Sequence, residues 1–392
     1  MKRFLSGLLP RVAAAIALGI LCGNLLPEWC VRMFVTFNEV FGQLLGFAIP
    51  LIIAGLVTPA IADIGRGAGR MLALTAALAY AATVAAGFAS YLVGAAIFPS
   101  LITSRVEVDA AAEAADIAPY FSMEIPPIMG VMTALVLAFM LGLGIAHLRG
   151  DTLRRAAGEF RDVVSMAIDA VILPLLPLYI FGIFMNMTAS GEVFRVLGVF
   201  AKIIGVIFLL HIAWLVALYA VAGAVARRNP LRMLGRMMPA YFTALGTQSS
   251  AATIPVTLER AIKMGVRPDV AGFVIPLCAT IHMSGSTLKI VACAVALMIV
   301  HGMPFDTMMF ASFIAMLGVT IVAAPGVPGG AIMASLGLLS SVLGFSESDN
   351  AMMIALYIAM DSFGTACNIT GDGAIAQIVD RIFSRKTASA TA

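Results

Sequence analysis

Apolar stretches long enough to cross a membrane recur along the whole chain, and short polar segments separate them. A helix needs about 20 apolar residues to cross the hydrocarbon core of a bilayer, and each stretch reaches or approaches that length. We therefore predict an all-α integral membrane protein. The first six predicted spans lie near residues 11–27, 33–62, 71–98, 126–147, 163–189 and 194–226.

The charges between these spans alternate along the chain. Lysine and arginine gather before the first span and after the second, fourth and sixth, whereas the loop at 100–124 is mainly acidic. Because cytoplasmic loops carry an excess of Lys and Arg, the first six spans are predicted to begin and end in the cytoplasm. The N-terminus imitates a signal peptide but lacks a convincing small-residue cleavage site, so we interpret it as the first span.

Composition agrees with a membrane protein. Of 392 residues, 61% are hydrophobic and 11% are charged, whereas a soluble domain has about 25% charged residues. The five cysteines lack the paired spacing of a metal site and are interpreted as small apolar residues. The net charge of +3 says little about partners, and we expect membrane lipid and a small molecule, not nucleic acid.

Two later segments are apolar but do not fit a single crossing. Residues 237–259 have a polar centre, 246–250, and basic residues on both sides, so both flanks are predicted to be cytoplasmic. Residues 303–346 have a Gly- and Pro-rich centre, 324–330, and acidic or neutral flanks. We predict that each segment is a re-entrant hairpin, the first entering from the cytoplasm and the second from outside. Non-helical backbone at that depth must contact protein or a wet cavity.

Each predicted hairpin is followed by a helix with a polar interruption. The helix at 268–300 is interrupted at 282–287, and the helix at 350–382 carries a similar run at 368–372, where we expect a second break. Two hairpins that enter from opposite faces, each followed by a broken helix, form the pattern of an inverted repeat. In such transporters the substrate and the coupling ion bind near the bilayer midplane, at the interface of the repeats.

The helix at 350–382 also carries the most informative polar residues. Asp361, Thr365, Asn368 and Asp372 follow one another at steps of four, three and four, which puts them on one helix face. Ionisable side chains are costly inside a membrane unless they face protein, water, an ion or a ligand. This stripe is therefore the best candidate in the chain for a site that handles something charged.

The C-terminal part of the chain resembles the glutamate transporter family, the dicarboxylate/amino acid:cation symporters. The resemblance is strongest over 230–385, while the N-terminal half agrees in helix count and only weakly in residues. It rests on four motifs taken together: Ser249-Ser250 with Thr253 and Pro255, Thr280 with Met283-Ser284-Gly285, Gly326-Val327-Pro328-Gly329, and Asp361…Thr365…Asn368…Gly371-Asp372.

The resemblance implies the fold of that family: eight transmembrane helices plus two re-entrant helical hairpins, assembled as a homotrimer in the inner membrane with both termini cytoplasmic. Residues 1–230 would be mostly trimerisation scaffold, with the third and sixth helices joining a transport core at 231–386. Residues 387–392 would be a cytoplasmic tail. The core would move like an elevator, with the hairpins as gates.

The resemblance also implies roles for individual residues. Asp361 matches the carboxylate that binds the amino group of the substrate, and Thr365 and Asn368 match residues that bind its α-carboxylate. The resemblance also implies a backbone part of the substrate site and a set of sodium ligands. The backbone of the hairpin tips would complete the substrate site at Ser249, Ser250, Val327 and Gly329. One or two sodium sites would use Asp372 with the carbonyls of Asn368 and Cys278, and Thr280 with carbonyls near Ile321, Val322 and Ala324.

Two departures from the family bear on the substrate. Acidic-amino-acid members carry an arginine where this chain has Gly364, so the clamp for a side-chain carboxylate is missing and a neutral substrate is favoured. Lys289 stands where the family commonly has a tyrosine close to that arginine. Its charge can compensate Asp361 or Asp372 inside the protein, contact an anionic substrate, or extend to the interface. We place charge compensation first and substrate contact second.

A third departure bears on the coupling ion. The family sequence Asn-Met-Asp-Gly-Thr is His282-Met283-Ser284-Gly285-Ser286 here, so a carboxylate of a third, deeper sodium site is missing. Tyr80 and Thr83 match other parts of that site, but Val84 replaces a serine. We expect that deeper site to be lost. His282 lies beside the expected ion site and is ionisable near neutral pH, which leaves proton coupling open beside sodium.

These residues favour a cation-coupled symporter of a small amino acid, with a neutral substrate preferred. An anionic amino acid or dicarboxylate bound through Lys289 stays open, and an anion-conducting channel is the alternative outside the transporters. We expect no enzyme: Asp361 and Asp372 are about 16 Å apart along one helix, too far for a carboxylate pair. No nucleotide-binding P-loop is visible in the sequence.

Overall fold

The computed structural model describes residues 8–66, 70–102, 117–191, 193–323 and 329–390, and within these ranges the regular structure is entirely helical. The all-α prediction is thus confirmed for this part of the chain. The helices, in chain order, are α1 (Leu8–Leu25), α2 (Glu28–Arg66), α3 (Arg70–Leu101), α5 (Val131–His147), α6 (Thr152–Ala167), α7 (Leu173–Ala189), α8 (Val193–Ala226), α9 (Pro230–Thr247), α10 (Ser250–Met264), α11 (Pro268–Ile281), α12 (Ser284–Val300), α13 (Thr307–Thr320), α14 (Gly330–Leu343), α15 (Glu347–Ala359) and α16 (Asp361–Ala390).

Membrane-spanning length is reached in several places of the described chain. Five helices there are long and apolar enough to cross a membrane, and the bent pair α15–α16 adds a sixth. The span predicted at 163–189 begins earlier, because α6 starts at Thr152 and continues through a π-helical turn at Ile168–Ile172 into α7. The helices α1, α5, α13 and α14 are apolar but shorter. The full count of eight spans and two re-entrant hairpins stays a prediction.

The helices form two groups by their contacts. The first group is α1, α2, α5, α6 and α7, in which α2 packs on α5, α6 and α7, and α1 packs on α7. The second group contains α3 and α8 to α16, because α3 packs on α12 and α13 while α8 packs on α16, α9 and α12. The groups meet where α14 contacts α2 and α15 contacts α1 and α7.

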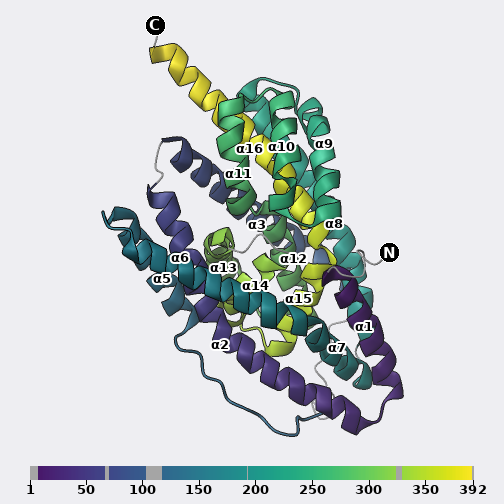
Figure 1. Cartoon of the computed structure of the whole chain (residues 1–392). Coiled ribbons are helices and arrows are strands. Elements are labelled where there is room, and N and C mark those ends of the chain that lie inside the picture. Colours follow the sequence, from purple (N-terminus) through teal and green to yellow (C-terminus); the bar gives the residue numbers. More distant parts are fainter. Residues whose placement is uncertain (1–7, 67–69, 103–116, 192, 324–328, 391–392) are drawn as a thin grey trace.

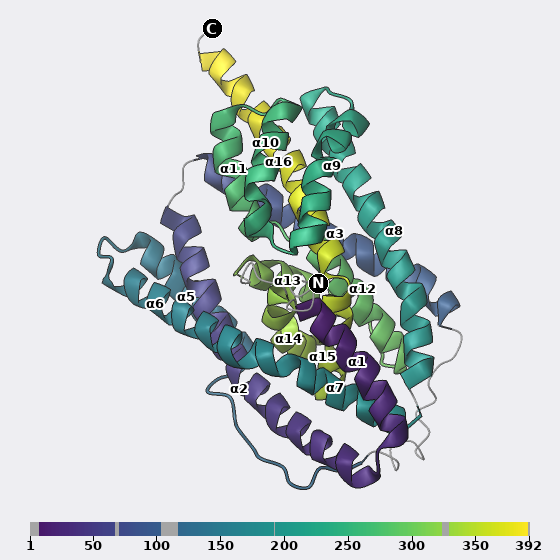
Figure 2. The ribbon, with the colours of Figure 1, turned by 45° about the vertical axis from the view of Figure 1, so that its right-hand side comes forward.

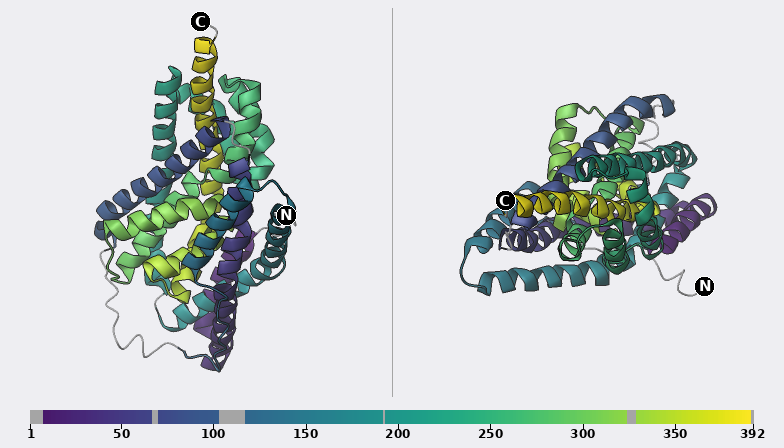
Figure 3. Two further views of the ribbon diagram at one scale, coloured as in Figure 1. Left: turned by 90° about the vertical axis from the view of Figure 1, so that its left-hand side faces the viewer. Right: turned by 90° about the horizontal axis from the view of Figure 1, so that it is seen from above.

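Parts of the two groups lie at opposite ends of the molecule. In Figures 1 and 2, α9, α10, α11 and the outer part of α16 lie side by side at the end that carries the C-terminus, while α1, α2 and α7 lie toward the other end. The side view in Figure 3 shows the same separation, with green and yellow segments at one end and purple segments at the other. The helices α12 to α15 lie between these ends (Figure 1).

The turn between α9 and α10 is built by its polar tip. Gln248 has φ 53°, a left-handed conformation that ends α9, and Ser249 caps α10 by accepting a hydrogen bond from the backbone N–H of Ala252 at 3.3 Å. Thr253 adds a bond from its hydroxyl to the Ser249 carbonyl at 2.8 Å. The predicted tip therefore forms a tight turn between two helices that lie against each other.

The predicted interruption of the helix at 268–300 is confirmed. α11 ends at Ile281, α12 begins at Ser284, and the backbone of His282 is extended, with φ −98° and ψ 104°. This break frees the first N–H groups of α12, which need acceptors from elsewhere. Asn368 of α16 supplies one: its Oδ1 accepts from the N–H of Gly285 at 2.7 Å and of Ser286 at 3.3 Å.

The break expected at 368–372 is wrong. α16 runs without interruption from Asp361, and the break lies at Met360, where α15 and α16 meet at an angle of 63°. A carboxylate in the first turn favours a helix start because it faces the positive end of the helix dipole. Gly371 serves close packing: a Cβ there would lie 2.6 Å from Cε1 of His282. The glycine makes room for the imidazole ring and does not bend the helix.

Candidate functional site

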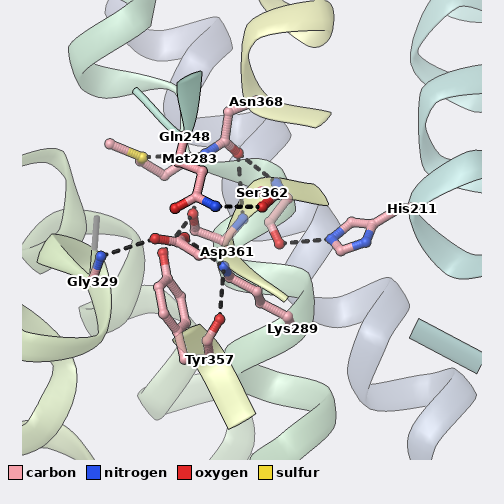
Figure 4. A network of polar contacts seen from close by, with 11 residues as sticks. His211, Gln248, Met283, Lys289, Gly329, Tyr357, Asp361, Ser362 and Asn368 are labelled. Carbon is pink, nitrogen blue, oxygen red and sulfur yellow. Dashed lines mark hydrogen bonds and ion pairs between the residues drawn. The ribbon is translucent and has the colours of Figure 1, made fainter. Parts of the chain in front are cut away.

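An ion pair between Asp361 and Lys289 lies at the centre of the site. Nζ of Lys289, on α12, is 2.8 Å from Oδ1 of Asp361, at the start of α16. The side chains are 0% and 6% exposed. Figure 4 shows the ammonium group below the carboxylate, between α12 and α16. Lys289 therefore compensates the charge of Asp361 inside the protein, which is the arrangement that we placed first.

Tyr357 of α15 supplies the other contacts of the ammonium group. Nζ of Lys289 lies 3.3 Å from the centre of the Tyr357 ring and donates a hydrogen bond to the Tyr357 carbonyl at 3.4 Å. An ammonium group over an aromatic face is attracted by the electron density of the ring. The Tyr357 hydroxyl in turn donates to Oγ of Ser286 at 3.1 Å. The lysine is thus held on three sides by protein groups.

The missing side chain of Gly364 makes room for this lysine. A Cβ at position 364 would lie 2.9 Å from both Cε and Nζ of Lys289, closer than real carbon atoms approach. The space that an arginine at 364 would enter is therefore occupied by the Lys289 ammonium. The two departures that appeared independent in the sequence are one structural feature.

The second oxygen of Asp361 is bonded to the start of α14. Oδ2 accepts a hydrogen bond from the backbone N–H of Gly329 at 2.9 Å (Figure 4). Gly329 precedes α14 with φ 80°, a conformation that favours glycine. The carboxylate thereby joins three elements, α12, α14 and α16. Of the expected residues of the second tip, Gly329 meets Asp361, whereas Val327 lies outside the described residues.

The Asn368 side chain holds the broken helix together. Beyond the two bonds that its oxygen accepts from α12, its Nδ2 donates to Oγ of Ser286 at 3.1 Å and contacts Sδ of Met283 at 3.4 Å. Both ends of the amide are therefore engaged within the protein. Asn368 is 3% exposed and lies two helical turns after Asp361 on α16, and its side chain acts as a cap of α12.

We expect Asn368→Ala to destabilise the protein by about 2 kcal/mol, because the first N–H groups of α12 would lose their acceptor. Thermal unfolding in detergent measures the change. Asn24→Ala is the matched control, since the Asn24 amide donates only to a carbonyl on the exposed side of α1. Equal melting temperatures for the two variants would contradict the capping role.

The remaining substrate candidates lie around this centre. Thr365 is 7% exposed, one turn after Asp361, and its hydroxyl makes no hydrogen bond with the described residues. Ser250 is 7% exposed, and Ser249 is half-buried at the tip between α9 and α10. Gln248 at the same tip donates from Nε2 to Oγ of Ser362 at 3.0 Å, beside Asp361 (Figure 4). The tip of the α9–α10 pair and the start of α16 thus enclose the site together.

Asp372, the carboxylate of the first expected sodium site, contacts His282. Nδ1 of His282 lies 2.9 Å from Oδ1 of Asp372, and both side chains are fully buried. Oδ2 of Asp372 and Nε2 of His282 have no hydrogen-bond partner within the described structure. The Cys278 carbonyl accepts a helical bond from the His282 N–H at 2.8 Å. The arrangement leaves one carboxylate oxygen of Asp372 without a partner, which suits a hard cation that prefers oxygen ligands.

The residues of the second expected sodium site lie only partly within the described chain. Thr280 is exposed and donates to the Leu277 carbonyl at 2.7 Å, while Ile321 and Val322 lie in a single 3₁₀ turn that contacts α11. Ala324 lies outside the described residues. Near the third site that we expect to be lost, the Thr83 hydroxyl accepts a hydrogen bond from the N–H of Met283 at 3.3 Å, so it helps to hold the break between α11 and α12.

Three residues of the site escaped the sequence analysis. His211 of α8 is 2% exposed, and its Nε2 lies 2.9 Å from the Gly285 carbonyl at the start of α12 (Figure 4). An ionisable residue in the middle of a long apolar helix is a sequence signal that could have found it. Tyr357 lies four residues before Asp361, a spacing that also points to it. The contact of Gln248 with Ser362 joins segments that are far apart in the sequence, and no local sequence pattern predicts it.

Comparison with known proteins identifies the family of the chain. The chain is 28% identical to proteins named serine/threonine transporter SstT from Acinetobacter baumannii strains ATCC 17978 and AYE, over 95% of this chain and 96% of theirs. Residues 8–382 match the description of a sodium:dicarboxylate symporter family. These residues include both groups of helices and every polar contact of Figure 4. The chain is a multi-pass membrane protein that belongs to the sodium:dicarboxylate symporter family.

Proposed function

We propose that this protein is a cation-coupled symporter of a small amino acid with an uncharged side chain. One observation carries the choice of an uncharged substrate. The only cation at the described centre, Lys289, is fully buried and engaged by Asp361 and Tyr357, so no free bidentate clamp is offered to a second carboxylate. The names of the relatives, which transport serine and threonine, support the same class of substrate.

Asp361 retains the capacity to bind the ammonium group of such a substrate. A carboxylate has about four acceptor positions on its two oxygens. Lys289 uses one position on Oδ1, and the Gly329 N–H uses one on Oδ2. A substrate ammonium can therefore share or replace the lysine, and the Thr365 hydroxyl lies one helical turn away to donate to the α-carboxylate.

Asp372 is the proposed ligand of the coupling cation. Its Oδ2 is fully buried without a partner in the described structure, and a buried carboxylate oxygen favours a bound cation. Sodium is the cation in the family description. One or two sodium ions per cycle are proposed here. A proton is the alternative, because His282 already occupies the other oxygen of Asp372.

The architecture supports a carrier with a moving core. We infer that α1, α2, α5, α6 and α7 form the scaffold of a homotrimer in the inner membrane. The pairs α9–α10 and α13–α14 would then be re-entrant hairpins of a core that moves like an elevator, with both termini cytoplasmic. The support is the grouping of contacts, in which α3 and α8 pack mainly with the C-terminal helices and only slightly with α2 and α7. Two hairpins that gate one shared site suit a carrier with alternating access, in which the site opens to one side of the membrane at a time. A channel does not need such a pair of gates.

One observation favours an anionic substrate as the second candidate. Nζ of Lys289 occupies the space beside Gly364, where the arginine of acidic-amino-acid members would begin. A dicarboxylate or anionic amino acid that drew the ammonium away from Asp361 would find a positive charge near that place. An anionic substrate would add a net negative charge to a buried pair that is already neutral, whereas a zwitterionic substrate adds none.

Uptake by the purified protein in proteoliposomes tests the proposed function. We expect labelled serine or threonine to accumulate above its external concentration when a sodium gradient is imposed, and to fall to the passive level when sodium is replaced by choline. Repeating the uptake at several pH values, with no sodium gradient, tests the proton. Current without accumulation of any amino acid would indicate a channel and contradict the proposal.

A further inference from the structure

We propose that Lys289 is a tethered counter-cation that stands in for the substrate's ammonium group on Asp361 whenever the site is empty. The inference rests on the proposed function, because it concerns the return of the empty carrier. Its physical basis is the ion pair of Lys289 and Asp361 and the bond from Gly329 to the same carboxylate.

The first step is the charge of the empty site. Asp361 is 4% exposed and Lys289 is fully buried, so neither charge is screened by solvent. An unpaired carboxylate at this depth would be costly, and the lysine cancels it without any bound ion. The empty site is therefore electrically neutral at Asp361, and moving it across the membrane moves no net charge from this pair.

The second step is the geometry around the carboxylate. Lys289 approaches Oδ1, while the N–H of Gly329 donates to Oδ2, so the lysine does not compete with the start of α14. The contact between α14 and α16 therefore persists in the empty site. An arriving ammonium group takes a place on Asp361 while Lys289 stays against the ring and carbonyl of Tyr357. The carboxylate that the zwitterionic substrate brings with it keeps the total charge of the loaded site at zero.

The third step concerns the space that this arrangement needs. Cε and Nζ of Lys289 fill the space beside Gly364, and a Cβ at position 364 would lie 2.9 Å from both, so a larger residue there requires the end of the lysine to move. Gly364 thus permits the present position of Lys289. Lys289 acts through Asp361, so it is a positioning residue that completes the transport cycle without touching the substrate.

The test compares net uptake with exchange in proteoliposomes. Net uptake requires the empty site to return, whereas exchange of labelled for unlabelled serine at equal concentrations does not. In Lys289→Met, the ratio of net uptake to exchange should fall at least about tenfold, because the unpaired Asp361 raises the barrier for the empty return. Lys202→Met, which removes an exposed lysine of α8, should leave this ratio as in the wild type.

The rise in melting temperature that serine causes separates the proposed role of Lys289 from a purely structural one. Serine should raise the melting temperature of Lys289→Met by more than that of the wild type, because its ammonium group replaces the missing lysine. An equal shift in both proteins, or an equal loss of net uptake and exchange, would overturn the proposal.

Wild-type protein provides a test that no folding defect can obscure. Net uptake should proceed when the vesicle interior contains only N-methyl-D-glucamine as cation, because the return needs no exported inorganic cation. Net uptake that depends on internal potassium would overturn the tethered-cation role while leaving symport intact. Absence of any accumulation by the wild type would instead contradict the proposed function itself.

Discussion

Asp361→Asn is expected to abolish amino-acid uptake and to destabilise the protein. The variant removes the carboxylate that the substrate ammonium would bind, and it leaves the ammonium of Lys289 buried without a counter-charge. Breaking a buried ion pair in this way costs about 3–5 kcal/mol. Uptake in proteoliposomes and thermal unfolding in detergent measure the two effects on the same preparation.

The control is the double variant Asp361→Asn with Lys289→Met, which separates the two effects. An apolar replacement of the whole pair is often neutral for stability, so the melting temperature should recover most of the loss. Uptake should not recover, because no carboxylate is restored. Amino-acid uptake by either variant at the wild-type rate would contradict the assignment of Asp361 as the ligand of the substrate ammonium group.

Gly364→Arg is expected to inactivate the carrier in the presence of Lys289. The new side chain would enter the volume of the lysine, since even a Cβ would lie 2.9 Å from Nζ. Two buried cations would then share the single carboxylate of Asp361. We expect a lower melting temperature and loss of serine uptake.

Gly364→Arg combined with Lys289→Tyr is expected to convert the substrate preference. The tyrosine is the residue that the glutamate transporter family commonly has at this place, and the arginine regains both its space and Asp361 as a counter-ion. A bidentate bond to a substrate carboxylate contributes about 1.5–3 kcal/mol, or roughly 10- to 100-fold in preference. Competition of aspartate against serine uptake measures the change. A double variant that still prefers serine would show that other residues determine the preference.

The local features of this fold could be predicted because they are written in short stretches of sequence. Apolar length gave the helices, and the polar tip at 246–250 together with the interruption at 282–287 predicted the turn and the break that the structure contains. Each of these features depends on residues within a few positions of one another, where helix caps and backbone preferences decide the conformation.

The features that could not be predicted depend on which distant side chains meet. Lys289 and Asp361 are 72 residues apart, and the sequence alone left Asp372 as an equal partner for the lysine. The structure decides between them: Nζ of Lys289 lies 2.8 Å from Oδ1 of Asp361, and His282 contacts Asp372 instead. The break before α16 was misplaced because the run at 368–372 resembles the interruption at 282–287, whereas Gly371 in that run makes room for the distant ring of His282.

A comparison of L-serine with L-glycerate tests the central claim most directly. The two molecules differ in that glycerate carries a hydroxyl in place of the α-ammonium group, so only serine offers a cation to Asp361. We predict that excess unlabelled serine abolishes uptake of labelled serine into wild-type proteoliposomes, while excess glycerate or succinate leaves it unchanged. Inhibition by glycerate or succinate as strong as that by serine would contradict an amino-acid site centred on Asp361.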